Sequence, residues 1–210
     1  NEEYIIDIID NGFQGEGIAK IEGVPVFIPK AIKGEKIRVK ILKVLSSHCF
    51  GKIVEILEKS EYRKCEDCDT ANRCGGCSLR HVDYDYSMEI KKNAVENTIS
   101  KGLGRDIKID EVIKMEEPFF YRNKLQYPVG ISKEGKTIMG VYAERTHTII
   151  ETKECKIQDE ISQEIANDIF NFIKENNIAV YNEKTLKGSI RHIIIRIGKK
   201  TGEVMITLVS

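Results

Sequence analysis

Short apolar runs separated by glycine dominate the first part of the chain. Five runs rich in β-forming residues lie between residues 1 and 58: EYIIDII, GEGIAKI, VPVFIPK, EKIRVKILKV and CFGKIVEIL. Glycines between the runs supply turns, and the prolines lie at run edges, where a missing backbone N–H is tolerated. Five short strands at this spacing predict a small OB-like β-barrel, which we assign to residues 1–60.

The remainder of the chain mixes helices and strands. Met88, Val95 and Ile99 recur at helical spacing, and glycines follow them, which predicts a helix over residues 84–101. A second, amphipathic helix is predicted over residues 157–173. The runs KIDEVIKM, NKLQYPVGI, KTIMGVYA, THTIIET, SIRHIIIRIG and GEVMITLV read as strands, the last two joined by a hairpin turn.

These patterns predict a fold of class β plus α/β. The expected parts are a five-stranded barrel over residues 1–60, a cysteine-rich loop over 61–80, a helix over 81–105 and an α+β domain over 106–210.

Composition narrows the class of protein. The 210 residues include 33 Lys plus Arg and 33 Asp plus Glu, so the formal net charge is zero. Hydrophobic residues make up 41% of the chain, which is enough for a core and argues against global disorder. No apolar run reaches the roughly 18 residues that a membrane helix needs, and the N-terminus lacks a secretory pattern. We therefore expect a cytoplasmic protein with no membrane partner.

The ends of the sequence suggest a piece of a longer protein. The chain begins at Asn1 rather than at Met, and it stops within the apolar run EVMITLVS. Trimming of a complete small protein explains the first observation but not the second. We expect further chain beyond Ser210.

Four of the six cysteines lie in one short segment, CEDCDTANRCGGC. In a reducing compartment this density indicates a bound metal rather than disulfides. The spacing Cys68-x5-Cys74-x2-Cys77 with a remote fourth cysteine is close in form to the ligand pattern of ferredoxins, and Cys155 is the natural fourth ligand. We expect a closed iron–sulfur cluster that is structural or redox-silent.

The glycines between two of these cysteines fit the same interpretation. Gly75 and Gly76 would let the loop fold close and turn backbone N–H groups toward the sulfides. Zinc is the alternative metal, although five residues between its two cysteine pairs is a short spacer. Its ligands would be Cys65, Cys68, Cys74 and Cys77.

Basic residues are unevenly distributed despite the zero net charge. They cluster between residues 30 and 43, where Arg38 and Lys40 alternate with apolar residues and so share one strand face. A basic face on a small barrel suits nucleic-acid phosphates, and a solvated strand explains it equally well. The segments FFYRNKLQ and SIRHIIIRIG add basic residues next to aromatic or apolar ones. The candidate RNA-binding residues are Lys30, Lys33, Lys36, Arg38, Lys40, Arg122, Lys124, Gln126, Arg191 and His192.

Histidines and carboxylates form no convincing catalytic constellation in this sequence. His192 lies beside apolar residues, where a histidine is more often structural than catalytic. The other histidines, among them His147, have no acid or nucleophile at a recognisable spacing.

Four motifs follow one another in a specific order: CEDCDTANRCGGCSLRH, FFYRNKLQYPVG, HTIIETKECKIQ and GSIRHIIIRIGKKTGEVMITLV. Together they resemble the RNA uridine-5 methyltransferases of the TrmA/RumA type. The earlier stretch DNGFQGEGIAKIEGVPVFIPKAIKGEKIRVKIL resembles the TRAM domain of the cluster-bearing branch. Arg80 departs from the family pattern, which more often has Gln before the His.

This resemblance implies a three-part enzyme: an RNA-binding TRAM barrel, a central domain with a 4Fe-4S cluster, and a domain that binds S-adenosyl-L-methionine. The last domain, with its catalytic residues, is absent from this sequence, so we expect the chain alone to be inactive. The likeness favours 23S rRNA as the partner. It implies as cluster ligands Cys68, Cys74, Cys77 and Cys155.

Further expectations follow from the missing domain. The helix over residues 84–101 would pack against that domain, and its exposed stripe would make the piece self-associate. A zinc-stabilised RNA-binding module and an iron–sulfur redox protein are the alternative functions.

Overall fold

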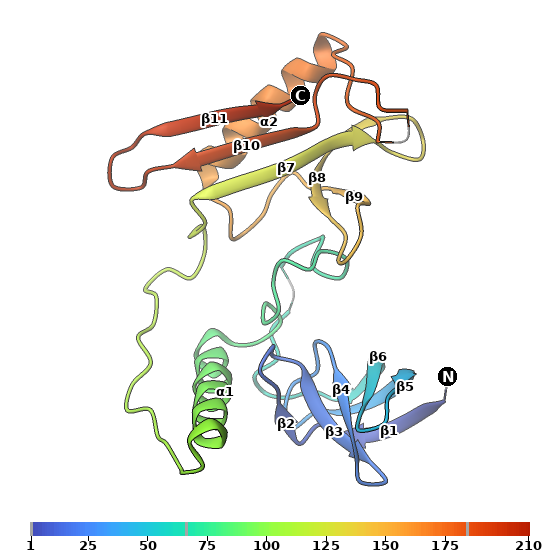
Figure 1. Cartoon of the computed structure of the whole chain (residues 1–210), viewed down its shortest axis with the longest axis vertical. Coiled ribbons are helices and arrows are strands. Elements are labelled where there is room, and N and C mark those ends of the chain that lie inside the picture. Colours follow the sequence, from blue (N-terminus) through green and yellow to red (C-terminus); the bar gives the residue numbers. More distant parts are fainter. Residues whose placement is uncertain (1, 66, 184) are drawn as a thin grey trace. The chain divides into compact units, whose positions relative to one another are not determined.

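The chain separates into two compact units (Figure 1). The computed structural model describes residues 2–65, 67–183 and 185–210. Unit 1 comprises residues 1–67 and 77–114, and unit 2 comprises residues 68–76 and 115–210. Each unit combines one sheet with one helix, so the described chain is a mixed β protein. Among the described residues, no helix is both long enough and apolar enough to cross a membrane.

The sheet of unit 1 has six strands in the order β1-β5-β6-β4-β3-β2. Neighbouring strands are antiparallel, except that β4 and β6 are parallel. Each of the five predicted runs forms a strand. The strands are β1 (Glu3–Asp7), β2 (Asp10–Asn11), β3 (Gly17–Ile21), β4 (Val24–Ile28), β5 (Lys36–Val44) and β6 (Cys49–Glu58).

The predicted closed, five-stranded barrel is not what the structure shows. The sheet includes β2 as a sixth strand, and its order of paired strands ends at β1 and β2. Just after β1, Ile8 N–H donates to Glu35 O and Ile9 N–H donates to Ile18 O. Only the second of these bonds reaches β3, and the described strands β1 and β3 are not paired as a ladder, so the sheet stays open.

The core of unit 1 consists mainly of Ile and Val side chains, as the composition predicts. In β5, Ile37, Val39 and Ile41 are buried and alternate with the charged side chains. Cys49 packs partly buried against this core.

Helix α1 (Tyr84–Leu103) begins and ends as its sequence predicts. The Asp83 side chain caps its first turn, and Gly104 ends it with a φ of 63°. Ile90 of this helix packs in a small apolar cluster with Ile32 and Val82 of the same unit. The predicted stripe is wrong in part, because Met88 is buried but Val95 and Ile99 are 41% and 39% exposed.

The run KIDEVIKM does not form the predicted strand. Side chains of α1 bind backbone donors in and just before this run: Ile109 N–H donates to Glu96 Oε1, and Ile107 N–H, which precedes the run, donates to Ser100 Oγ. The alternating apolar pattern of this run therefore belongs to a segment that is hydrogen-bonded to α1 rather than to a strand of a sheet.

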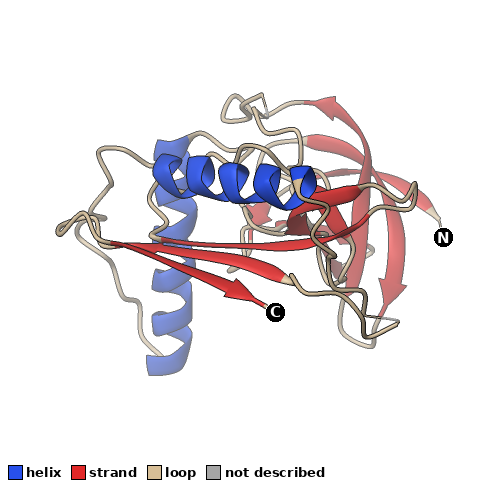
Figure 2. Cartoon of the chain, turned by 90° about the horizontal axis from the view of Figure 1, so that it is seen from above, coloured by secondary structure: helices blue, strands red, loops and turns tan. Residues whose placement is uncertain are grey.

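The sheet of unit 2 is antiparallel, with the order β11-β10-β7-β8-β9, and one helix lies along it (Figure 2). The Asp159 side chain caps the first turn of that helix. These elements confirm the predicted helix and five predicted strands. They are β7 (Lys124–Ile131), β8 (Thr137–Tyr142), β9 (Ile149–Glu151), α2 (Glu160–Glu175), β10 (His192–Ile197) and β11 (Val204–Val209).

The two faces of this sheet differ in character. On one face, buried residues of β7 and β10 such as Leu125 and Ile195 pack with Ala166, Phe170 and Ile173 of α2. Because side chains alternate along a strand, the intervening residues lie on the opposite face. Those residues are Lys124, Gln126 and Pro128 of β7 and His192, Ile194 and Arg196 of β10.

Candidate functional site

The cysteine loop of unit 2 is fixed at the end of β8. Within it, Cys74 N–H donates to Thr70 O at 2.8 Å and Ala71 N–H donates to Cys68 O at 3.1 Å. A β-bridge joins Cys74 to Ala143. The loop therefore has a defined path without an apolar core of its own.

The two glycines serve the close packing that the sequence predicts. A Cβ on Gly75 would lie 2.8 Å from Glu144 Cγ, so a larger residue would push the loop away from β8. The N–H of Gly76 donates to Cys74 Sγ at 3.4 Å. Such backbone donors stabilise thiolates and the sulfur atoms of clusters.

The segment before α2 positions Cys155. Its N–H donates to Oε1 of Gln163, a buried residue of α2. Nε2 of the same side chain donates to Gln158 O at 3.1 Å. One buried amide thus holds both ends of the segment that carries the remote cysteine.

Cys68, Cys74 and Cys155 all act electrostatically on the hydroxyl of Tyr127. Burial raises the pKa of Tyr127 most, and negative charge on Cys155, Cys74 and Cys68 raises it further. The hydroxyl has no hydrogen-bond partner among the described residues. Cysteines that are far apart in the sequence therefore influence one buried polar atom.

Arg122 also belongs to this region rather than to the open sheet face. The charge of its guanidinium lowers the pKa of Tyr127. The backbone N–H of Arg122 donates to Ile157 O at 3.0 Å. The role of Arg122 as an RNA ligand stays a prediction.

The four predicted ligands are divided between the two units. Cys77 follows Gly76 in the sequence but belongs to unit 1. Within the described parts of the chain, no three His, Cys, Asp or Glu side chains close on a single metal ion. Cys65, which zinc would need, is exposed, and none of the six cysteines is paired in a disulfide within those parts. The four ligands stay a prediction.

The basic row of β5 lies between acidic side chains. Lys36 is paired across the sheet with Asp7 and Glu58, at 3.7 Å from the latter. Arg38 lies opposite Glu55 and its Nη2 is 3.0 Å from Oε2 of that residue. Lys40 lies between Glu3 and Lys52. This face therefore carries four basic and four acidic residues: Lys36, Arg38, Lys40 and Lys52 with Glu3, Asp7, Glu55 and Glu58.

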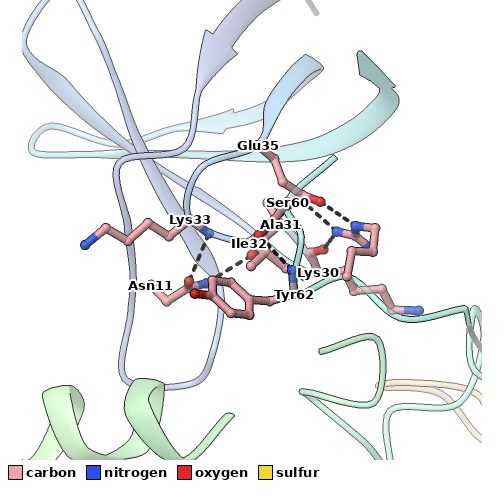
Figure 3. A network of polar contacts seen from close by, with 9 residues as sticks. Asn11, Lys30, Ala31, Ile32, Lys33, Glu35, Ser60 and Tyr62 are labelled. Atoms are coloured by element: carbon pink, nitrogen blue, oxygen red, sulfur yellow. Dashed lines mark hydrogen bonds and ion pairs between the residues drawn. The ribbon is translucent and has the colours of Figure 1, made fainter. Parts of the chain in front are cut away.

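The loop before β5 is organised by a buried ion pair (Figure 3). Glu35 is fully buried; it is bound by Nε and Nη2 of Arg63 and accepts from Ile32 N–H at 2.9 Å. Arg63 Nη2 also donates to Lys30 O, and Lys33 N–H donates to Asn11 Oδ1. The backbone of both predicted RNA-binding lysines is thus held in place.

An aromatic cluster on unit 1 was missed in the sequence. Phe27 and Phe50 are paired between β4 and β6 with ring centroids 6.0 Å apart, and His48 lies 5.4 and 5.1 Å from them. Lys43 is paired with Phe50 across the sheet. Aromatic side chains alternating with buried residues in VPVFI and CFGKI are the pattern that points to this surface.

Four of the predicted RNA-binding residues lie on or beside the exposed face of the sheet of unit 2: Lys124, Gln126, Arg191 and His192. Lys124, Gln126 and His192 lie on the face away from α2, and Arg196, which is paired with Lys124, joins them. Arg191, just before β10, donates from Nη2 to Glu183 Oε1 at 2.9 Å. His192 Nε2 is 3.2 Å from the Tyr142 hydroxyl, and burial lowers the pKa of His192 most.

Comparisons with known proteins give these observations a context. Residues 1–54 match the family model of the TRAM domain. The chain is 46% identical to a protein of Clostridium acetobutylicum named as an RNA methyltransferase, over all of this chain and 46% of that protein. A Staphylococcus aureus protein of the same kind of name is 39% identical, over 97% of this chain and 45% of its own length.

A solved structure is similar as well. The crystal structure of Pyrococcus abyssi tRNA (uracil-54, C5)-methyltransferase with S-adenosyl-L-homocysteine matches 97% of this chain and 45% of its own, with a TM-score of 0.68 and 26% identity. The chain thus spans just under half the length of the proteins that it matches. It begins with a TRAM domain and is similar along its whole length to part of proteins named RNA methyltransferases.

Proposed function

We propose that this chain is the RNA-binding and 4Fe-4S-binding portion of a cytoplasmic, S-adenosyl-L-methionine-dependent RNA uridine-5 methyltransferase. The observation that carries the proposal is the electrostatic influence of Cys68, Cys74 and Cys155, which are distant in the sequence, on the buried and unpartnered hydroxyl of Tyr127. The whole-length similarity to proteins named RNA methyltransferases supports the reaction class, and the TRAM domain supports an RNA partner.

The residues around the cysteines suit a cluster. Tyr127 Oη, Gln158 Oε1 and Ser162 Oγ are buried in unit 2 without a partner among the described residues, and two of them can donate a hydrogen bond. Cluster sulfides and ligand thiolates accept such bonds. When bound, a cluster would cross-link the cysteine loop to the segment before α2, so we propose a structural role for it with Cys77 as the remaining ligand.

The chain's own contribution to methylation is binding and orientation. We place RNA phosphates at Lys124 and Arg196 on the open face of unit 2. In unit 1 we place them at Lys30 and Lys33, the lysines of the loop before β5. Unpaired bases would stack on the Phe27, His48 and Phe50 rings, because aromatic platforms beside lysines bind single strands in OB-like domains. We assign S-adenosyl-L-methionine and the methyl transfer to a further domain, so the 210 residues alone do not methylate RNA.

Metal analysis of an anaerobic preparation tests the cofactor. We expect iron and sulfide, with broad visible absorption, in the unaltered chain and their loss in Cys155→Ser. Cys65→Ser and Cys49→Ala are the matched controls and should retain iron. Zinc that survives Cys155→Ser but is lost in Cys65→Ser would contradict the cluster and support the zinc-stabilised module.

RNA binding and methylation test the rest of the proposal. The chain should bind single-stranded RNA with an affinity that falls steeply with salt concentration. Incubation with labelled S-adenosyl-L-methionine should give no uridine methylation, and a protein extended to the length of the relatives should methylate C5. The first RNA to test as a methylation substrate is 23S rRNA, and transfer RNA is the matched comparison. Reversible reduction of the cluster without salt-sensitive RNA binding would instead indicate a redox protein.

A further inference from the structure

Unit 2 contains a pocket that no step above uses. It has a volume of about 430 Å³ and lies where the end of β8, the start of β10 and the segment around Tyr181 meet. Its walls are partly aromatic and partly charged. The residues used below are Lys133, Tyr142, His147, Tyr181, Glu183 and Arg191.

The aromatic side chains offer flat surfaces. The rings of Tyr142 and His147 are stacked, with centroids 5.5 Å apart and an angle of 30° between their planes. The guanidinium of Arg191 lies over the ring of Tyr181, at 5.4 Å from its centroid. His147 is mostly exposed, at 76% for its side chain, so the outer face of this stack is open to a planar ligand.

Two of the polar groups at the pocket, the carboxylate of Glu183 and the guanidinium of Arg191, lie side by side. Glu183 accepts from Arg191 Nη2 at 2.9 Å and lies 3.5 Å from His147 Nδ1. Each carboxylate oxygen can accept a further bond, and Arg191 has further N–H donors. Side chains of Glu183 and Arg191 are 47% and 46% exposed, so both are accessible to a ligand.

Tyr142 is fixed from its other end. Its hydroxyl lies 3.2 Å from His192 Nε2, on a strand that pairs with the centre of the sheet. Tyr142 therefore has support from β8 and β10, whereas His147 belongs to the loop before β9. Support by strands limits the positions open to the Tyr142 ring.

We propose that this pocket binds an unpaired guanine of the RNA, an inference that rests on the proposed RNA-binding function. Guanine places N1–H and the 2-amino group side by side, which matches the two oxygens of one carboxylate. Its O6 and N7 atoms accept from a guanidinium, the pairing that proteins use most often for this base. Adenine has no ring N–H on that edge, and uracil has one. Lys133 at the pocket wall supplies a cation for the adjoining phosphate.

Binding of short, fluorescently labelled single-stranded RNAs to the metal-loaded 210-residue chain tests this inference. The oligonucleotides share one uridine-rich sequence and differ at one central position, which is guanine, inosine, adenine or cytosine. We expect guanine to bind between about 5-fold and about 150-fold more tightly than adenine. Inosine, which lacks the 2-amino group, should fall between the two.

Glu183→Gln supplies the decisive variant. It keeps the shape of the side chain but offers one acceptor in place of two, so the preference for guanine should disappear while the other RNAs still bind. Glu164→Gln, an exposed residue of α2, is the charge-matched control and should keep the preference. Thermal unfolding of both variants checks that they fold.

The outcomes separate the two proposals. Equal, salt-sensitive binding of all four RNAs, or a guanine preference that survives Glu183→Gln, would overturn the guanine pocket and leave RNA binding standing. No binding of any RNA would overturn the proposed function together with the pocket.

Discussion

The two sheets each carry a row of basic side chains, and the rows differ in what lies beside them. In unit 1, the neighbours of Lys36 and Arg38 across the sheet include Asp7, Glu58 and Glu55. In unit 2, Arg196 lies between a lysine and a methionine. A basic stripe in a sequence thus becomes a basic surface only if the register brings no acids next to it.

The consequence is a division of labour between the units. Cross-strand ion pairs on an exposed face lower the local charge and add little stability. On the proposed function, we therefore expect the first sheet to stack bases, through its aromatic cluster, and the second to contact phosphates. Four predictions break or sharpen this contrast.

The largest expected effect concerns the buried ion pair that organises the loop before β5. Glu35→Gln leaves the Arg63 guanidinium, only 14% exposed, without its counter-charge. We expect the free energy of unfolding to fall by about 3 to 5 kcal/mol in urea titrations. The loss of this ion pair should also free the backbone of the loop that carries Lys30 and Lys33.

Glu58→Gln is the matched control for that change. Its partner Lys36 lies 3.7 Å away and the Glu58 side chain is 71% exposed, so the loss should stay below about 1 kcal/mol. Equal losses in the two variants would mean that the loop of unit 1 does not depend on its buried pair.

A titration gives the next largest effect, again in unit 1. Burial, and then the Arg63 guanidinium, lower the pKa of His81 to about 4, against 6.5 for the free side chain. Between these values the unfolded chain binds a proton that the folded chain does not, so stability falls as the pH decreases from about 6.5 to 4. The difference amounts to about 3 kcal/mol.

The variant His81→Gln removes that titration. Its free energy of unfolding should vary less than that of the unaltered chain over the same pH range. The same slope in both proteins would show that His81 does not titrate as its burial implies.

Local patterns predicted the elements well because strands and helices depend on neighbours in sequence. The alternation of Ile37, Val39 and Ile41 with charges is visible without the fold, as is the glycine stop at Gly104. A strand as short as β2 leaves no such pattern. The strand predicted at 108–115 does not form, because donors in and just before it bind Glu96 and Ser100, side chains of the preceding helix.

The site was less predictable because it depends on contacts between distant segments. The spacing of Cys68, Cys74 and Cys155 suggested one group, and charge on all three acts on Tyr127, while their role as ligands stays a prediction. Nothing local in the sequence could reveal the partner of His147, which is Glu183, 36 positions away. The compensation of the β5 charges likewise depends on register, which no single strand encodes.

Stacking on unit 1 should have an effect of intermediate size. Phe50→Ala removes a ring that is 38% exposed and contacts Phe27 and His48. We expect the affinity for single-stranded RNA to fall by about 1 to 3 kcal/mol. The slope of log affinity against log salt should not change, because no phosphate contact is removed. Leu42→Ala, an exposed apolar residue of β5, is the control, and an equal loss there would exclude a specific stacking role.

The smallest effect compares one arginine from each row directly. Arg196→Gln removes a cation that has no acidic neighbour across the sheet, so the salt slope for single-stranded RNA should decrease by about 0.7, the value for one phosphate. Arg38→Gln removes a cation that is already paired with Glu55, and its slope should stay unchanged. Filter binding over a series of salt concentrations measures both. If Arg38→Gln lowered the slope and Arg196→Gln did not, the first sheet would be the phosphate-binding surface despite its acids, because RNA would have to displace Glu55 to reach Arg38.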